Sequence, residues 1–125
     1  MSILLKVLLF ALLSLGFSLA EDMPEGSEQF YVSSNLFITL SILPAECNMP
    51  DESVNLACGY YRGDFPTFRA NLDAVVTQYL PGLVLAADWF ENGEGLVRDY
   101  RSENGQYLIG YNPGGVIVVA FLPTR

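Results

Sequence analysis

Two aspartates, Asp88 and Asp99, come nearest to forming an acid–base pair in this sequence. A four-residue loop between the strands expected over 83–91 and 96–103 would place them opposite each other. Paired carboxylates can act as acid and base when burial separates their pKa values, and they can also bind calcium. The alternative is a solvated charge cluster beside Arg101, in which neither carboxylate is catalytic.

The residue types that build other common active sites are missing. The chain has no histidine and only two cysteines, Cys47 and Cys58, so neither a Ser-His nor a Cys-His nucleophile system can form. Two thiols alone cannot complete a tetrahedral zinc site. The glycines at 93–95 and 114–115 are turn glycines, because neither group opens a helix after a strand. We therefore expect no enzyme activity, no catalytic residue, no metal and no cofactor.

Residues 1–20 have the composition of a secretory signal peptide. Lys6 precedes an apolar run over 7–15, and the small residues Ser18 and Ala20 stand at positions −3 and −1 of a cut after Ala20. The run is shorter than the roughly 20 residues that a spanning helix needs. An uncleaved membrane anchor is the alternative. Cleavage predicts a secreted or periplasmic protein of the bacterial envelope, with no membrane contact afterwards.

Export would determine the state of the cysteines and the charge of the mature chain. In an oxidising compartment, Cys47 and Cys58 are expected to form a disulfide. Loss of Lys6 shifts the formal net charge from −8 to −9. This charge disfavours nucleic acid and anionic membranes, and it favours a basic protein as partner.

The mature part predicts a flexible acidic tail over 21–29, followed by a single domain over 30–125. Alternating apolar residues over 36–42 predict a strand with one apolar face. Residues 45–63 contain both cysteines and many turn formers, and they predict a short disulfide loop.

The remaining residues predict one helix and a run of hairpins. Apolar residues recur at helical spacing between a cap at Asp64 and a stop at Pro81. Four strands follow, joined by glycine-containing turns, over 83–91, 96–103, 106–111 and 116–122. The order β-α-β-β-β-β predicts an α+β fold, with one amphipathic helix packed on a mostly antiparallel sheet of about five strands.

The turn before the last strand gives a candidate binding surface. A turn at Pro113-Gly114 would pair Tyr111 with Val116, which directs the odd-numbered residues of the last strand away from the helix. Together with aromatic and basic residues of the disulfide loop, they form the candidate surface: Ile117, Val119, Phe121, Tyr60, Tyr61 and Arg62. The alternatives are that the tail or the disulfide loop covers this surface, or that the last strand is buried on both faces.

Arg98 falls on the expected core face, beside Trp89 and Tyr111. Stacking on an aromatic ring would give it a structural role there.

Together, these patterns favour an exported, non-catalytic domain that binds another protein as an inhibitor or accessory subunit. One alternative is a small-ligand or hydrolytic module that uses Asp88 and Asp99. Another is a structural homodimer built through the last strand.

Overall fold

The computed structural model describes residues 27–47 and 55–124, and it confirms an α+β fold with an antiparallel sheet. The sheet has six strands in the order β1-β2-β6-β5-β4-β3, where the sequence predicted about five. A second α-helix precedes the first strand. The elements in chain order are α2 (Glu28–Thr39), β1 (Leu43–Ala45), β2 (Asn55–Tyr60), α3 (Phe65–Tyr79), β3 (Val84–Asn92), β4 (Gly95–Ser102), β5 (Gly105–Asn112), the 3-10 turn η2 (Pro113–Gly115) and β6 (Val116–Pro123).

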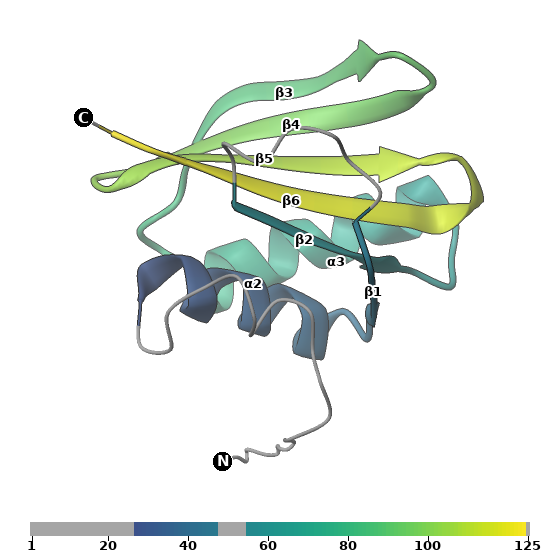
Figure 1. Ribbon diagram of the computed structural model, residues 1–125, viewed down its shortest axis with the longest axis horizontal. Coiled ribbons are helices and arrows are strands. Elements are labelled where there is room, and N and C mark those ends of the chain that lie inside the picture. Colours follow the sequence, from purple (N-terminus) through teal and green to yellow (C-terminus); the bar gives the residue numbers. More distant parts are fainter. Residues whose placement is uncertain (1–26, 48–54, 125) are drawn as a thin grey trace.

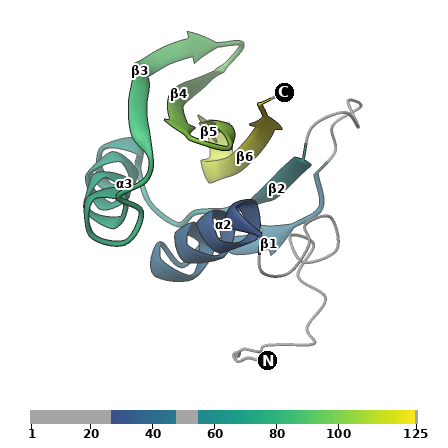
Figure 2. The ribbon, with the colours of Figure 1, turned by 90° about the vertical axis from the view of Figure 1, so that its left-hand side faces the viewer.

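The domain has two layers. Both α-helices pack on one face of the sheet, and no helix of the described part of the chain covers the other face (Figures 1 and 2). The sheet is strongly curved, as the view along its strands shows (Figure 2). The core lies between the helices and the sheet, and its most buried residues are Leu36, Phe68, Leu72, Tyr107, Ile109, Ile117 and Val119.

The helix expected after Asp64 is confirmed as α3. The Asp64 carboxylate accepts a 3.0 Å hydrogen bond from the backbone N–H of Thr67, which satisfies a donor that the helix leaves free. Phe68, Leu72 and Val75 are buried against the sheet. Their spacing of three and four residues places them on one side of the helix.

The strand expected over 36–42 is wrong, because most of these residues belong to α2 and the turn after it. Ser27 caps this helix by accepting a 3.2 Å hydrogen bond from the backbone N–H of Phe30. The residues that α2 and its cap bury are spaced for a helix: Val32, Leu36, Phe37 and Leu40. The alternation of apolar and polar residues was a coincidence within this longer period.

Helix α2 also contains the last two residues of the tail expected over 21–29, Glu28 and Gln29. The expected signal peptide over 1–20 lies outside the described residues.

The segment expected to be a disulfide loop contains strand β2, which pairs with β1 on one side and with β6 on the other. The disulfide itself is confirmed between Cys47 and Cys58, whose Cα atoms are 5.3 Å apart. Gly59 of β2 lies where a Cβ would come within 2.5 Å of the Leu43 carbonyl oxygen. The close approach of β1 to β2 therefore requires glycine at this position.

The turn before β6 has three residues instead of the expected two, and this changes the face of the whole strand. Tyr111 pairs with Ile117 across Pro113–Gly115. Two glycines of this turn have φ values of 82° and 78°, which glycine adopts without strain. The expected pairing of Tyr111 with Val116 is wrong by one residue. A slip of one residue moves every side chain of a strand to the opposite face.

Candidate functional site

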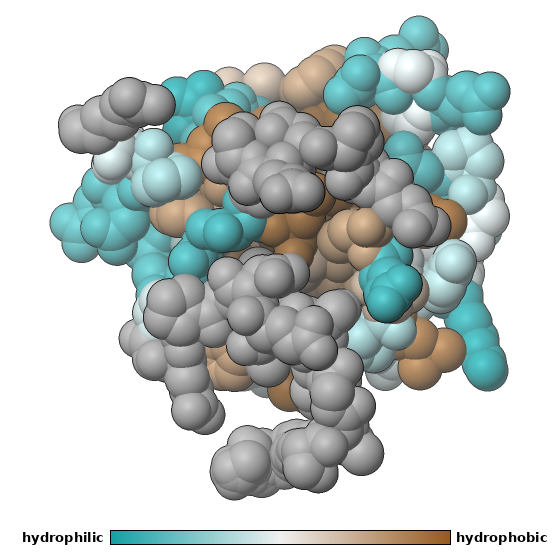
Figure 3. Space-filling view, in the orientation of Figure 1, coloured by the Kyte–Doolittle hydropathy of each residue, from teal (hydrophilic) through white to brown (hydrophobic). Residues whose placement is uncertain are grey.

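The face of the sheet that no described helix covers, called the outer face below, is apolar at its centre. Residues directly opposite each other on neighbouring strands share a face. The pairing therefore places six partly exposed apolar residues on the outer face: Leu56, Val97, Leu108, Val116, Val118 and Ala120. Figure 3 shows hydrophobic residues over the sheet, with hydrophilic residues to either side. Such an apolar patch with a polar rim is typical of a surface that binds protein.

Gly110 stands between Val97 and Val118 in one row across three strands of the outer face, and it is itself buried. A Cβ added at Gly110 would have its nearest neighbouring atom 3.6 Å away, at ordinary contact distance. A methyl group on residue 110 would therefore fit without any movement of the strands.

The three expected binding residues of the last strand lie in the core and not on the outer face. Their exposed fractions are 0% for Ile117, 1% for Val119 and 7% for Phe121. The ring of Phe121 packs against that of Tyr107, with 4.7 Å between the centroids. The expectation of an exposed triplet is wrong, because the three-residue turn exchanges the two faces of β6. Its even-numbered residues lie on the outer face instead.

The other three expected binding residues are adjacent in sequence and separate in space. Tyr60 is 51% exposed and pairs with Leu43, also exposed, at one end of the outer face. Tyr61 points to the opposite side, where its ring lies 5.1 Å from that of Phe68 and its hydroxyl accepts a hydrogen bond from Asn71. Arg62 is exposed beyond the end of β2. Of the three, only Tyr60 joins the outer face.

Asp88 and Asp99 lie on opposite faces of the sheet. In the hairpin of β3 and β4, Ala87 and not Asp88 pairs with Asp99, because the register shifts between Ala87 and Phe90. This bulge turns Asp88 to the helix side, where Arg98 donates a 2.9 Å hydrogen bond to it. The expected placement of the two carboxylates opposite each other is therefore wrong.

Each of these aspartates is already bonded to an arginine. On the outer face, Asp99 accepts hydrogen bonds of 3.2 and 3.0 Å from Arg101. On the helix side, a hydrogen bond from the Trp89 backbone N–H, followed by that from Arg98, holds the pKa of Asp88 below its ordinary value. The arrangement favours two separate structural ion pairs over an acid–base pair.

Arg98 is buried on the helix side, and the expected stacking on an aromatic ring is confirmed. Its guanidinium carbon lies 5.2 Å from the centroid of the Trp89 ring. Burial would lower the pKa of Arg98, but hydrogen bonds to Asp73 and Asp88 outweigh burial and raise it. The residue is a permanently charged link between α3 and the β3–β4 hairpin.

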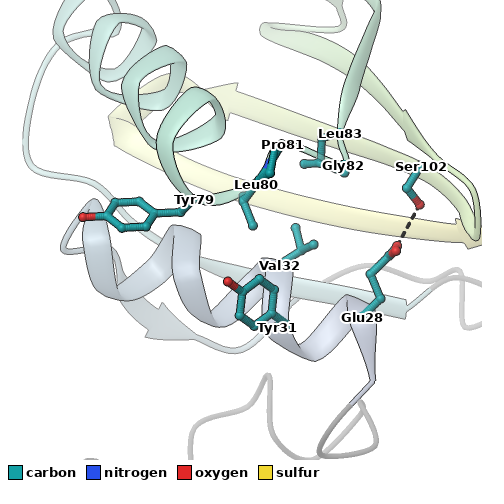
Figure 4. A pocket seen from close by; sticks show the side chains of 9 residues that line it. All are labelled: Glu28, Tyr31, Val32, Tyr79, Leu80, Pro81, Gly82, Leu83 and Ser102. Carbon is teal, nitrogen blue, oxygen red and sulfur yellow. Dashed lines mark hydrogen bonds between the residues drawn. The ribbon is translucent and has the colours of Figure 1, made fainter.

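A groove of about 230 Å³ opens where α2 begins and α3 ends (Figure 4). Its floor is apolar, formed by Val32, Leu80 and Leu83, and the exposed rings of Tyr31 and Tyr79 flank it. This groove could not be predicted from the sequence, because the residues of α2 were expected to be part tail and part strand.

The carboxylate of Glu28 lies beside Ser102 at one end of this groove (Figure 4). It accepts hydrogen bonds from three side chains: 2.7 Å from Ser102, 2.9 Å from Asn104 and 2.7 Å from Tyr107. The groove therefore has a fixed anionic group beside an apolar floor.

Two chemical features of the described residues bear on the site. Over 27–47 and 55–124, no three histidine, cysteine or acidic side chains gather as a metal site would require. Neither helix of this part of the chain is long and apolar enough to cross a bilayer.

Comparison with family models, curated proteins and solved structures gives no significant match.

Proposed function

We propose that this protein is an exported, non-catalytic module that binds another protein through the outer face of its sheet, as an inhibitor or accessory subunit. The observation that carries the proposal is the apolar outer face, which no described helix covers. Six partly exposed apolar residues give this face the character of a contact surface. Phe90 and Tyr60 extend it towards two edges of the sheet.

The charges support a binding role over a catalytic one. Asp73 and Asp88 bond to Arg98, and Asp99 bonds to Arg101. Carboxylates engaged in such ion pairs commonly have a structural role. The formal net charge of −8 favours a basic protein as the partner.

The cellular location is part of the same proposal. The Cys47–Cys58 disulfide fits an oxidising compartment. With the signal-like residues 1–20, it favours a secreted or periplasmic protein. N-terminal sequencing of the protein recovered from the envelope and the medium tests this, because cleavage after Ala20 predicts a chain that begins at Glu21.

Two variants that add the same charge at different places test the binding proposal. Val118→Asp places a carboxylate on the outer face, and Thr77→Asp places one on the exposed side of α3. Pull-downs from native envelope and medium would use wild type and both variants as bait, with circular dichroism to show that each bait is folded. We expect a stoichiometric partner with wild type and Thr77→Asp, and its loss with Val118→Asp.

Light scattering on the same proteins distinguishes a partner from a second copy of the chain. A wild-type dimer that Val118→Asp dissociates would replace the proposed partner with a homodimer. A complex that survives Val118→Asp, or a folded wild-type bait with neither partner nor dimer, would overturn the role of the outer face.

A further inference from the structure

The groove between α2 and α3 combines two features: apolar and aromatic walls, and a fixed carboxylate. Tyr31 and Tyr79 are 56% and 43% exposed, although both rings border the groove. Figure 4 shows Tyr79 towards one end and Glu28 at the other, with Val32 and Leu80 between them. A long side chain that lies along this line would meet apolar atoms first and the carboxylate last.

Glu28 is ionised and rigid. Burial alone would raise the pKa of Glu28, but the hydrogen bonds from Tyr107, Ser102 and Asn104 outweigh burial and lower it. Each of these donors lies in β4, β5 or the turn between them, so three contacts fix the position of the carboxylate. The charge is present at neutral pH and needs no movement to receive a ligand.

No cation of the described chain neutralises this charge. Over 27–47 and 55–124, the ion pairs join Arg98 and Arg101 to aspartates, and none includes Glu28. A carboxylate offers about four acceptor positions, and the three hydrogen bonds of Glu28 leave one of them on Oε1. The remaining acceptor position of the Glu28 carboxylate suits a single positively charged N–H donor.

We propose that the groove binds the basic side chain of an arginine or lysine in a partner polypeptide. Its aliphatic part lies on Val32, Leu80 and Leu83, and its charged end reaches Oε1 of Glu28. The rings of Tyr31 and Tyr79, which flank the groove, add apolar contact to this aliphatic part. The excess negative charge of the whole chain favours the approach of such a polypeptide.

This site is separate from the outer face, because both helices that form it pack on the opposite side of the sheet (Figure 2). The inference does not depend on the proposed function. The inference concerns one contact with the helix layer, which a partner of the outer face or a second ligand would make through a basic side chain.

The test is a titration of the ¹⁵N-labelled, disulfide-bonded protein with three capped tripeptides that have glycine on both sides of arginine, lysine or norleucine. Norleucine keeps most of the aliphatic chain of lysine and lacks its charge. At neutral pH and low salt, we expect saturable shifts of amides around Tyr31, Leu80 and Leu83 with the arginine and lysine peptides. We expect no saturation with the norleucine peptide.

Glu28→Gln removes the charge and can keep the three hydrogen bonds, because hydroxyl groups can also accept from an amide. We expect it to weaken binding of the basic peptides by about two- to fivefold. Glu94→Gln removes the same charge from the exposed turn between β3 and β4, and it should leave the affinity unchanged. Tyr79→Ala, which changes an exposed wall, should also weaken binding.

The proposal would be overturned if wild type, Glu28→Gln and Tyr79→Ala bound the basic peptides with equal affinity. It would also be overturned if Glu28→Gln and Glu94→Gln lost the same amount of affinity, because that would indicate only general charge attraction. Absence of saturation with both basic peptides would also overturn it. Val118→Asp separates the two sites, since it should abolish the complex of the outer face and leave peptide binding intact.

Discussion

The guanidinium of Arg98 stacks on the ring of Trp89, 5.2 Å from its centroid, and bonds at the same time to Asp73 of α3 and Asp88 of β3. One buried cation thus joins a helix, a bulged edge strand and the only tryptophan of the chain. Because the guanidinium is planar and forked, it can stack and donate to two carboxylates together, which an ammonium group cannot do.

We expect Arg98→Lys to lower the free energy of unfolding by about 1–3 kcal/mol. The fluorescence of Trp89 should change as well, because the cation leaves its ring. Urea denaturation followed by circular dichroism and by fluorescence measures both effects. The matched control is Arg101→Lys on the outer face, whose side chain is exposed and which should leave the fluorescence unchanged. Identical fluorescence in wild type and Arg98→Lys would contradict the stacking.

The two faces of β6 give a second prediction. Ile117 is fully buried, and Val118 is partly exposed on the outer face. We expect Ile117→Ala to lower the free energy of unfolding by about 2–5 kcal/mol, because it leaves a cavity. Val118→Ala should cost clearly less. Urea denaturation of both variants decides the register, since the opposite order would support the two-residue turn at Pro113-Gly114.

A third prediction concerns how the free energy of unfolding changes at acidic pH. Folding lowers the pKa of Glu28 below its ordinary value of 4.5, because the hydrogen bonds from Tyr107, Ser102 and Asn104 outweigh burial. Such a carboxylate stabilises the folded state above its ordinary pKa and loses this contribution as the pH falls through the lowered value.

We therefore expect wild type to be more stable than Glu28→Gln by about 1 kcal/mol at neutral pH. The difference should shrink below pH 4.5 as the carboxylate of wild type takes up its proton. Urea denaturation of both proteins at a series of pH values gives this difference directly. A constant difference from neutral to strongly acidic pH would show that Glu28 acts through its shape and not through its charge.

The disulfide gives a fourth prediction. Cys47 and Cys58 are 11 positions apart in the sequence. Closing a loop of this length should stabilise the fold by about 3 kcal/mol, because it restricts the unfolded chain. We expect reductant to lower the urea midpoint of wild type and to leave that of the double variant Cys47→Ala/Cys58→Ala unchanged. A wild-type midpoint that does not respond to reductant would contradict this stabilising role.

Helix α3 and the hairpins of β3 to β6 could be predicted from sequence because local chemistry specifies them. A capping aspartate, three buried residues at helical spacing and glycine-containing turns act within a few residues of each other. The cysteine pairing could also be predicted, since only one disulfide is possible within a chain of two cysteines.

The wrong predictions arose where a difference of one or two residues determines the type of an element or the face on which its side chains lie. Leu36, Ile38 and Leu40 fit a period of two, and only the wider pattern from Val32 shows the helix. The face of β6 depended on one residue in a turn, and that of Asp88 on one bulge. Glycines tolerate both two- and three-residue turns, so sequence alone could not choose between them. The groove at Glu28 could not be predicted because it requires α2.

The sheet order also sets when the molecule can fold during its synthesis. Strand β6 follows every other described element in the chain, yet it lies between β2 and β5 and contributes Ile117, Val119 and Phe121 to the core. A ribosome makes β2 and both helices well before β6, and until β6 arrives β2 has only the three residues of β1 as a partner. The emerging polypeptide therefore cannot complete its core before residue 121 has been made.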